Sequence, residues 1–104
     1  MNSNLTMIKK LKRAINAKGE KLLYNVSEFY SEDAQREITV YYIKKAVYNP
    51  KTGRNQNIEL FHSGSQIQIV LFLRDYWYKL NNIPLPTSNE KWNKIRKKIE
   101  EGTV

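Results

Sequence analysis

The chain of 104 residues is long enough for one domain, and its 18 Lys and Arg residues against 10 Asp and Glu give a net charge of +8. It contains no cysteine, which excludes disulfide bonds, thiolate zinc sites and a cysteine nucleophile. No apolar run is long enough to cross a bilayer, and basic residues interrupt the apolar positions near the N-terminus, so we expect a cytoplasmic protein. We expect residues 1–104 to form a single domain.

The positive charge is concentrated at the two ends of the chain. Residues 1–21 carry a net charge of +5, residues 22–89 carry +1, and residues 90–104 carry +2. A basic excess of this size makes a polyanion the first partner to consider, and the two ends are where it would bind.

The N-terminal residues 4–17 are predicted to form an amphipathic helix that ends near Gly19. Its apolar residues recur at helical spacing: Leu5, Ile8, Leu11 and Ile15. Basic residues occupy the remaining faces. A helix of about 14 residues is marginally stable alone, so we expect it to dock on the rest of the domain.

Two strands are predicted next. The first begins at Leu22 and leads to a polar connection at residues 31–35, for which a short helix over residues 27–34 is an alternative. The second covers residues 37–48, which are dense in β-branched and aromatic residues. Because this strand is apolar on both faces, either both faces are covered or one of them is an interface.

A hairpin turn at residues 49–53 leads into a third strand over residues 56–61. Pro50 presets φ for the first turn position, and Gly53 can adopt the left-handed conformation of a bulge. Three antiparallel strands are a reasonable minimum for a stable sheet.

Two helices are predicted to complete the chain. Residues 66–80 are apolar nearly all round, which predicts a central core helix buried on more than one side, and Ser65 with Gln68 has the spacing of a capping box. An extended strap follows. Thr87 with Glu90 forms a second capping box before a basic amphipathic helix that ends near Gly102.

These elements predict an α+β fold. A three-stranded antiparallel sheet would pack on the central apolar helix, and basic amphipathic helices would flank it at the N- and C-termini.

The sequence offers little catalytic chemistry. His62 is the only histidine, and it could act as a general base only if Glu59 or Asp75 oriented it. The neighbouring Ser63 and Ser65 are candidate nucleophiles, but Ser65 is better explained as a helix cap. The chain has neither a glycine-rich phosphate loop nor metal-ligand spacing, so we expect a protein without enzymatic activity, metal or cofactor.

Three separate elements carry residues suited to nucleic acid, because each Lys or Arg that neutralises a phosphate raises the affinity. The N-terminal helix supplies Lys9, Lys10, Lys12 and Arg13. The hairpin supplies Lys44, Lys45, Lys51 and Arg54, together with Asn55 and Asn57, whose amides suit base edges. The last helix supplies Lys91, Lys94, Lys97 and Lys98.

The hairpin and the helix after it, within residues 36–82, resemble the DNA-binding (arm-binding) domain at the N-terminus of phage and transposon integrases. In that family a turn of the type Asp/Asn-Pro-x-Thr-Gly-Lys/Arg often joins the second and third strands. The corresponding residues here are Asn49, Pro50, Lys51, Thr52, Gly53 and Arg54. The resemblance implies that the sheet enters the major groove of DNA, with strand residues reading bases.

The sequence therefore favours a small basic protein that binds DNA or RNA without catalysis, encoded by a phage or mobile element. The alternative is a protein-binding module, because the second strand and the central helix have more apolar surface than a chain of this length easily buries. A homodimer would cover that surface. So would a host protein that handles nucleic acid, if the chain is an inhibitor of the anti-CRISPR type.

Overall fold

The computed structural model describes residues 3–101, which form an α+β fold with one three-stranded antiparallel sheet, as predicted. The helices and strands, in chain order, are α1 (Ser3–Asn16), β1 (Leu22–Ser31), β2 (Arg36–Asn49), β3 (Arg54–Ser63), α2 (Gln66–Leu80) and α3 (Asn89–Glu101). The alternative of a short helix over residues 27–34 is wrong, because β1 continues to Ser31 and a turn then leads into β2.

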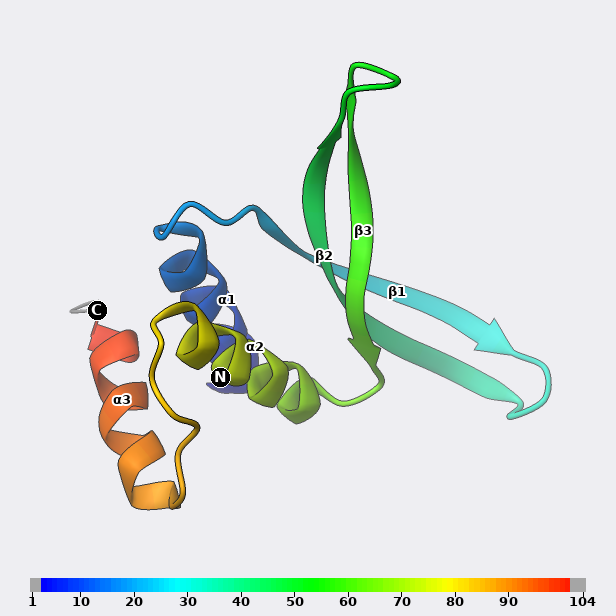
Figure 1. Ribbon diagram of the computed structural model, residues 1–104. Coiled ribbons are helices and arrows are strands. Elements are labelled where there is room, and N and C mark those ends of the chain that lie inside the picture. The colour runs from blue at the N-terminus through cyan, green and yellow to red at the C-terminus, as the bar shows by residue number, and fades with distance from the viewer. Residues whose placement is uncertain (1–2, 102–104) are drawn as a thin grey trace.

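The sheet is three strands wide only in its middle. Residues 41–45 of β2 pair with both neighbours, whereas residues 36–40 pair with β1 alone and residues 46–49 pair with β3 alone. Two-stranded ribbons therefore project from the middle in different directions (Figure 1). We call residues 27–40 arm 1 and residues 46–57 arm 2.

One face of the sheet lies against the helices. Residues paired across antiparallel strands share a face, which places Leu22, Tyr24, Tyr41, Ile43 and Phe61 on the same side. Leu22 and Ile43 belong to the buried core, and the three aromatic side chains pack against it. We call this side the covered face and the opposite side the open face.

The core itself lies between the helices. Met7, Ile8, Leu11 and Ile15 of α1 are almost fully buried, and α1 is the main packing partner of α2. The helix α2 meets the sheet at its middle, where Phe72 stacks on Phe61 with ring centroids 4.8 Å apart. Not every apolar position of α2 is buried, and Ile67 remains 53% exposed. Buried residues of α3, such as Trp92, extend the same core.

Both predicted capping boxes are wrong in their details. Ser65 occupies the N-cap of α2 in an extended conformation, but its side chain makes no capping hydrogen bond. At α3 the hydroxyl of Ser88, in place of Thr87, accepts a hydrogen bond from the backbone N–H of Lys91 at 3.3 Å. Such one-residue shifts arise because neighbouring hydroxyl residues compete for the same N–H groups.

The predicted glycine conformations are correct at two turns. Gly19, after α1, has φ of +98°, and Gly53, before β3, has φ of +66°. Both values lie in the left-handed region that side chains with a Cβ rarely adopt. The predicted end of the last helix at Gly102 lies outside the described residues, which end within α3 at Glu101.

Candidate nucleic-acid interface

Three of the four predicted basic residues of α1 line one hollow. Lys9, Lys12 and Arg13 surround an open volume of about 530 Å³ between α1 and β1, together with Asn16 and Tyr24. No acidic residue is among the side chains that line it. Three basic side chains therefore lie together in this hollow, as a contact with a phosphate backbone requires.

The wall of this hollow is fixed by contacts within the protein. The Nδ2 of Asn16 donates to the carbonyl oxygen of Leu22 at 3.1 Å, and the N–H of Leu22 donates to Oδ1 of Asn16 at 2.8 Å. Tyr24 stacks on Tyr41, and its buried hydroxyl has no hydrogen-bond partner among residues 3–101. Burial, and secondarily the neighbouring Tyr41, raises the pKa of the Tyr24 phenol, which keeps it neutral.

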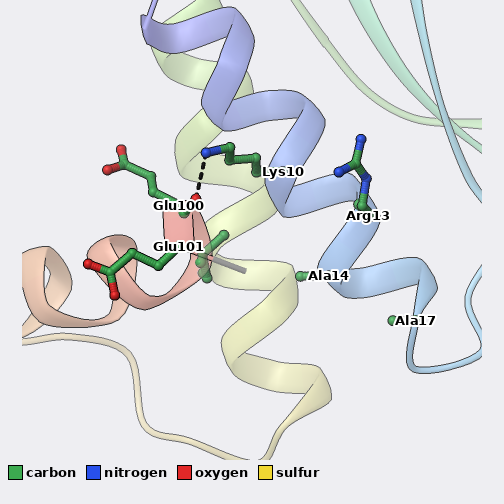
Figure 2. Close-up of a pocket in the computed structure, with 7 residues that line it drawn as sticks. Lys10, Arg13, Ala14, Ala17, Glu100 and Glu101 are labelled. Atoms are coloured by element: carbon green, nitrogen blue, oxygen red, sulfur yellow. Dashed lines mark hydrogen bonds between the residues drawn. The ribbon is translucent and has the colours of Figure 1, made fainter. Parts of the chain in front are cut away.

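Lys10 points away from this hollow and contacts α3. Its Nζ donates to the backbone carbonyl of Glu100 at 2.5 Å, as Figure 2 shows. A cation at the C-terminal end of a helix stabilises the unpaired carbonyls there. Glu100 and Glu101 line the same pocket as Lys10 and Arg13, but Figure 2 shows both carboxylates directed away from these cations, and Glu100 pairs with Arg96 at 3.1 Å. The interpretation of Lys10 as a phosphate ligand is therefore not supported by its position.

The lysines of α3 lie elsewhere. Lys91, Lys94 and Lys98 line a groove of about 440 Å³ beside the strap at residues 83–87, and this groove shares no residue with the α1 hollow. The fourth, Lys97, is exposed and does not line it. The structure thus divides the basic residues of the two terminal helices between separate sites.

The groove beside α3 has an apolar floor. Tyr78, Ile83, Leu85 and Ile95 line it below the three lysines. Ile83 and Leu85 are 39% and 47% exposed, so the strap presents apolar surface to solvent.

Arm 2 ends in a rigid turn. The Oδ1 of Asn49 accepts a hydrogen bond from the N–H of Lys51 at 2.9 Å, and the carbonyl of Asn49 accepts one from the N–H of Gly53 at 2.9 Å. The side chains of Lys51 and Arg54 are exposed, and neither makes a hydrogen bond or ion pair with any described residue. They are the most accessible cations among those predicted on the hairpin.

The amides of arm 2 are arranged by the strand register. Asn55 pairs with Tyr48 and Asn57 with Ala46, so both amides lie on the open face of the sheet, and Tyr48 is 62% exposed beside them. Gln56 points to the other side, with Arg54. Tyr48 and Gln56 were missing from the predicted site residues, although the alternation of the strand would have placed them on this ribbon.

Lys45 belongs to a network that holds the fold together. Its Nζ lies 3.1 Å from Oε2 of Glu20, whose other oxygen accepts a hydrogen bond from the hydroxyl of Tyr76 at 3.1 Å. The hydrogen bond to Glu20 is the main cause of the raised pKa of Lys45. Lys44 lies 5.4 Å from the ring centroid of Tyr42. These two lysines therefore have partners within the protein, unlike Lys51 and Arg54.

His62 has one of the two partners considered for it. Its Nδ1 lies 3.0 Å from Oε2 of Glu59, and both side chains are exposed to solvent. Asp75 instead pairs with Arg74 at 2.9 Å. The hydroxyl of Ser63 accepts a hydrogen bond from the N–H of Ser65, which caps the turn before α2. Among residues 3–101 no group of three His, Asp or Glu side chains is arranged to hold a metal ion.

Comparison of the chain with protein families, with curated proteins and with solved structures found no match. Within residues 3–101, no helix has the length and apolar character needed to span a membrane.

Proposed function

We propose that the protein binds nucleic acid, with arm 2 as the recognition element and the α1 hollow as a second contact with the phosphate backbone. The observation that carries this proposal is the exposed two-stranded ribbon of arm 2, with the unpaired cations Lys51 and Arg54 near its tip. The major groove of B-DNA, about 12 Å wide, admits a two-stranded β-ribbon. Arm 2 extends beyond the three-stranded middle and can enter such a groove without interference from β1.

The chemistry of arm 2 suits both kinds of contact in such a complex. Lys51 and Arg54 neutralise phosphates, whereas the amides of Asn55 and Asn57 can donate to and accept from base edges. The exposed ring of Tyr48 offers a surface on which an unpaired base can stack. The resemblance of residues 36–82 to integrase arm-binding domains supports DNA as the ligand and a phage or mobile element as the source.

The α1 hollow adds positive charge at a distance from arm 2. Lys9, Lys12 and Arg13 converge there without an acidic neighbour in the lining. Neutralising these three residues should weaken binding for all sequences equally, because phosphate contacts position a protein without reading bases.

The test is the salt dependence of binding, measured by fluorescence anisotropy with a labelled duplex and a labelled single strand. Replacing Lys51 and Arg54 together with alanine removes two phosphate contacts, which should reduce the slope of log K against log salt by about 1.8 for duplex DNA. The matched control, Lys18→Ala with Lys79→Ala, removes the same charge from exposed positions outside the proposed site. If both double variants behave alike, arm 2 does not bind nucleic acid.

The groove beside α3 favours a second candidate function, that of a protein-binding module acting on a host nucleic-acid-handling protein. Its apolar floor and three lysines would accept an acidic, apolar segment of such a partner. On this alternative, nucleic-acid binding is weak and is abolished for every variant at moderate salt. Replacing Lys91 and Lys94 with glutamate would then release the partner without affecting binding through arm 2.

A further inference from the structure

The strand β1 forms one edge of the sheet, and its outer side has no neighbouring strand. In an antiparallel strand the N–H and C=O of one residue point to the same side, and successive residues alternate. The side chain of Asn16 bonds to both groups of Leu22 from the outer side. On the inner side, the carbonyl of Lys21 accepts a hydrogen bond from the N–H of Ala46 in β2. The same alternation directs outward the backbone groups of Tyr24, Val26, Glu28 and Tyr30.

This outer edge of β1 is unprotected. Its outward backbone groups have no hydrogen-bond partner among residues 3–101. Natural proteins protect edge strands with lysine, proline or bulges, but residues 22–31 contain neither lysine nor proline, and they pair with β2 without a register shift. The pairing of the other edge strand, β3, is interrupted by a bulge beside Ile43 and Lys44. Of the two edges, that of β1 is therefore better suited to accept a further strand.

The same edge carries exposed apolar side chains. Val26, Phe29 and Tyr30 are 48%, 46% and 61% exposed. Val26 and Tyr30 point to the side of the sheet on which α1 lies, and Phe29 points to the open face. A strand added beside β1 would cover part of each of these side chains.

The two ends of this edge carry opposite charges. At its beginning lies the α1 hollow, which is lined by Tyr24 and by three cations of α1, with no acidic residue. At its other end lies the tip of arm 1, with Glu32 and Asp33 in the turn that follows Ser31. Arm 1 has a net charge of −3, although the whole chain has a net charge of +8. A strand that runs antiparallel to β1 and ends in acidic residues would place them at the α1 hollow, and β1 itself is such a strand.

We propose that two copies of this chain pair through their β1 edges, antiparallel, about a two-fold axis at Ser27. Tyr24 then pairs with the partner's Tyr30, and Val26 pairs with the partner's Glu28, through the outward backbone groups. Each of these pairs exchanges two hydrogen bonds. The two sheets become one sheet of twice the width, and each favourable contact occurs twice because the interface is symmetric.

The register of this pairing follows from where the free edge begins and ends. Asn16 occupies the edge at Leu22, and the strand ends at Ser31. Pairing residue 24 with residue 30 of the partner satisfies all the outward groups between these limits in both copies. The partner's acidic turn then follows directly beside Asn16, where the α1 hollow opens. Its two carboxylates thereby lie near the cations of α1: Lys9, Lys12 and Arg13.

The dimer has one consequence that rests on the proposed function. The partner's acidic turn occupies the α1 hollow, so it competes with a phosphate backbone for that site. Arm 2 takes no part in the pairing, because β2 and β3 alone form it. The dimer is measured without nucleic acid, so the two proposals can fail independently.

The test is sedimentation velocity at about 0.1 M salt, over about 1 μM to about 1 mM protein, a range that brackets weak association. One variant reverses the acidic turn, Glu32→Lys with Asp33→Lys, and another reverses the hollow, Lys12→Glu with Arg13→Glu. Either variant alone should dimerise at least about tenfold more weakly than the natural chain, because like charges then face each other at both contacts.

Mixing the two variants gives the decisive result. In the heterodimer the reversed turn meets the reversed hollow, and the natural turn meets the natural hollow, so association should be restored. A chain with all four substitutions should again form homodimers. A natural chain that is monomeric at every concentration, or a mixture that remains monomeric, would overturn the proposal.

A control variant separates local contacts from net charge. Arm 2 has a net charge of +2, from Lys51 and Arg54. Lys51→Glu with Arg54→Glu changes the net charge as much as the reversed hollow does, but it lies outside the proposed interface and should dimerise like the natural chain. Equal weakening by the two variants would contradict the proposed contacts.

A backbone substitution tests the strand pairing itself. Val26→Pro removes an N–H that points outward and keeps the pairing with β2, since proline is tolerated on an edge strand when its nitrogen faces solvent. It should dimerise at least about tenfold more weakly, whereas Val26→Thr, which keeps the N–H, should stay within about threefold of the natural chain. Thermal unfolding checks that both variants remain folded. Equal dimerisation by the two folded variants would show that the β1 edges do not pair.

Discussion

Asn16 provides a sharp test of how α1 is joined to the sheet. β1 is an edge strand, and the Asn16 side chain bonds to both the N–H and the carbonyl of Leu22 at its beginning, at 2.8 Å and 3.1 Å. The amide thus takes the place that a neighbouring strand would occupy. Both hydrogen bonds are partly buried, so water cannot fully replace them.

Replacing Asn16 with alanine should reduce the free energy of unfolding by about 2 kcal/mol. Each hydrogen bond contributes about 1 kcal/mol, and the backbone groups of Leu22 lose partners in a partly desolvated site. For a domain of this size the loss corresponds to a fall of about 10 °C in the melting temperature.

Urea unfolding followed by circular dichroism measures this change. Asn93→Ala is the matched control, because Asn93 is exposed on α3 and has no side-chain partner among residues 3–101, so its replacement should alter stability by less than about 0.5 kcal/mol. If Asn16→Ala is as stable as the control, the two hydrogen bonds do not hold the helix to the sheet.

Two further predictions concern the core and the alkaline range. Leu11→Ala should lower the free energy of unfolding, measured with urea, by about 2–5 kcal/mol, because Leu11 is fully buried. Ile58→Ala, at a position 45% exposed, should lower it by less than about 1 kcal/mol. Similar losses for the two variants would contradict the assigned core. The pKa values of Lys45 and Tyr76 are raised, the first mainly by its hydrogen bond to Glu20 and the second mainly by burial. The folded state therefore holds these two protons more tightly than the unfolded chain does. The stability that the two groups add to the fold is fully present below about pH 10 and is lost as the pH rises through their raised pKa values. Glu20→Gln should make the melting temperature fall less steeply between about pH 9 and pH 12, and an unchanged profile would exclude the network as the cause.

The order and type of the elements were predictable because each depends on a local pattern. The helical spacing of apolar residues in α1 and the density of β-branched and aromatic residues in β2 are visible in a few consecutive residues. Gly19 and Gly53 marked two turns for the same reason, since a left-handed conformation is a property of a single residue.

The roles of the cations were harder to assign because their partners are distant in sequence. The sequence treats Lys9 and Lys10 alike, yet Lys9 lines the α1 hollow and Lys10 bonds to the end of α3, 90 positions away. Lys45, in β2, likewise has its partner at Glu20, which precedes β1 in the chain. Which cations remain available for a ligand is decided by such contacts, which no local pattern contains.

The net charge, the α+β class and the turn positions follow from the amino-acid sequence by itself. Only the tertiary structure shows that β1 and β3 pair with opposite ends of β2 and overlap at residues 41–45, so that two oppositely charged arms project from a short three-stranded middle. The helices cover one face of that middle alone, because α1 and α2 pack chiefly on each other. Strand register and helix docking depend on contacts between distant residues, and for this reason the open face and the exposed tip of arm 2 became visible only in the folded chain.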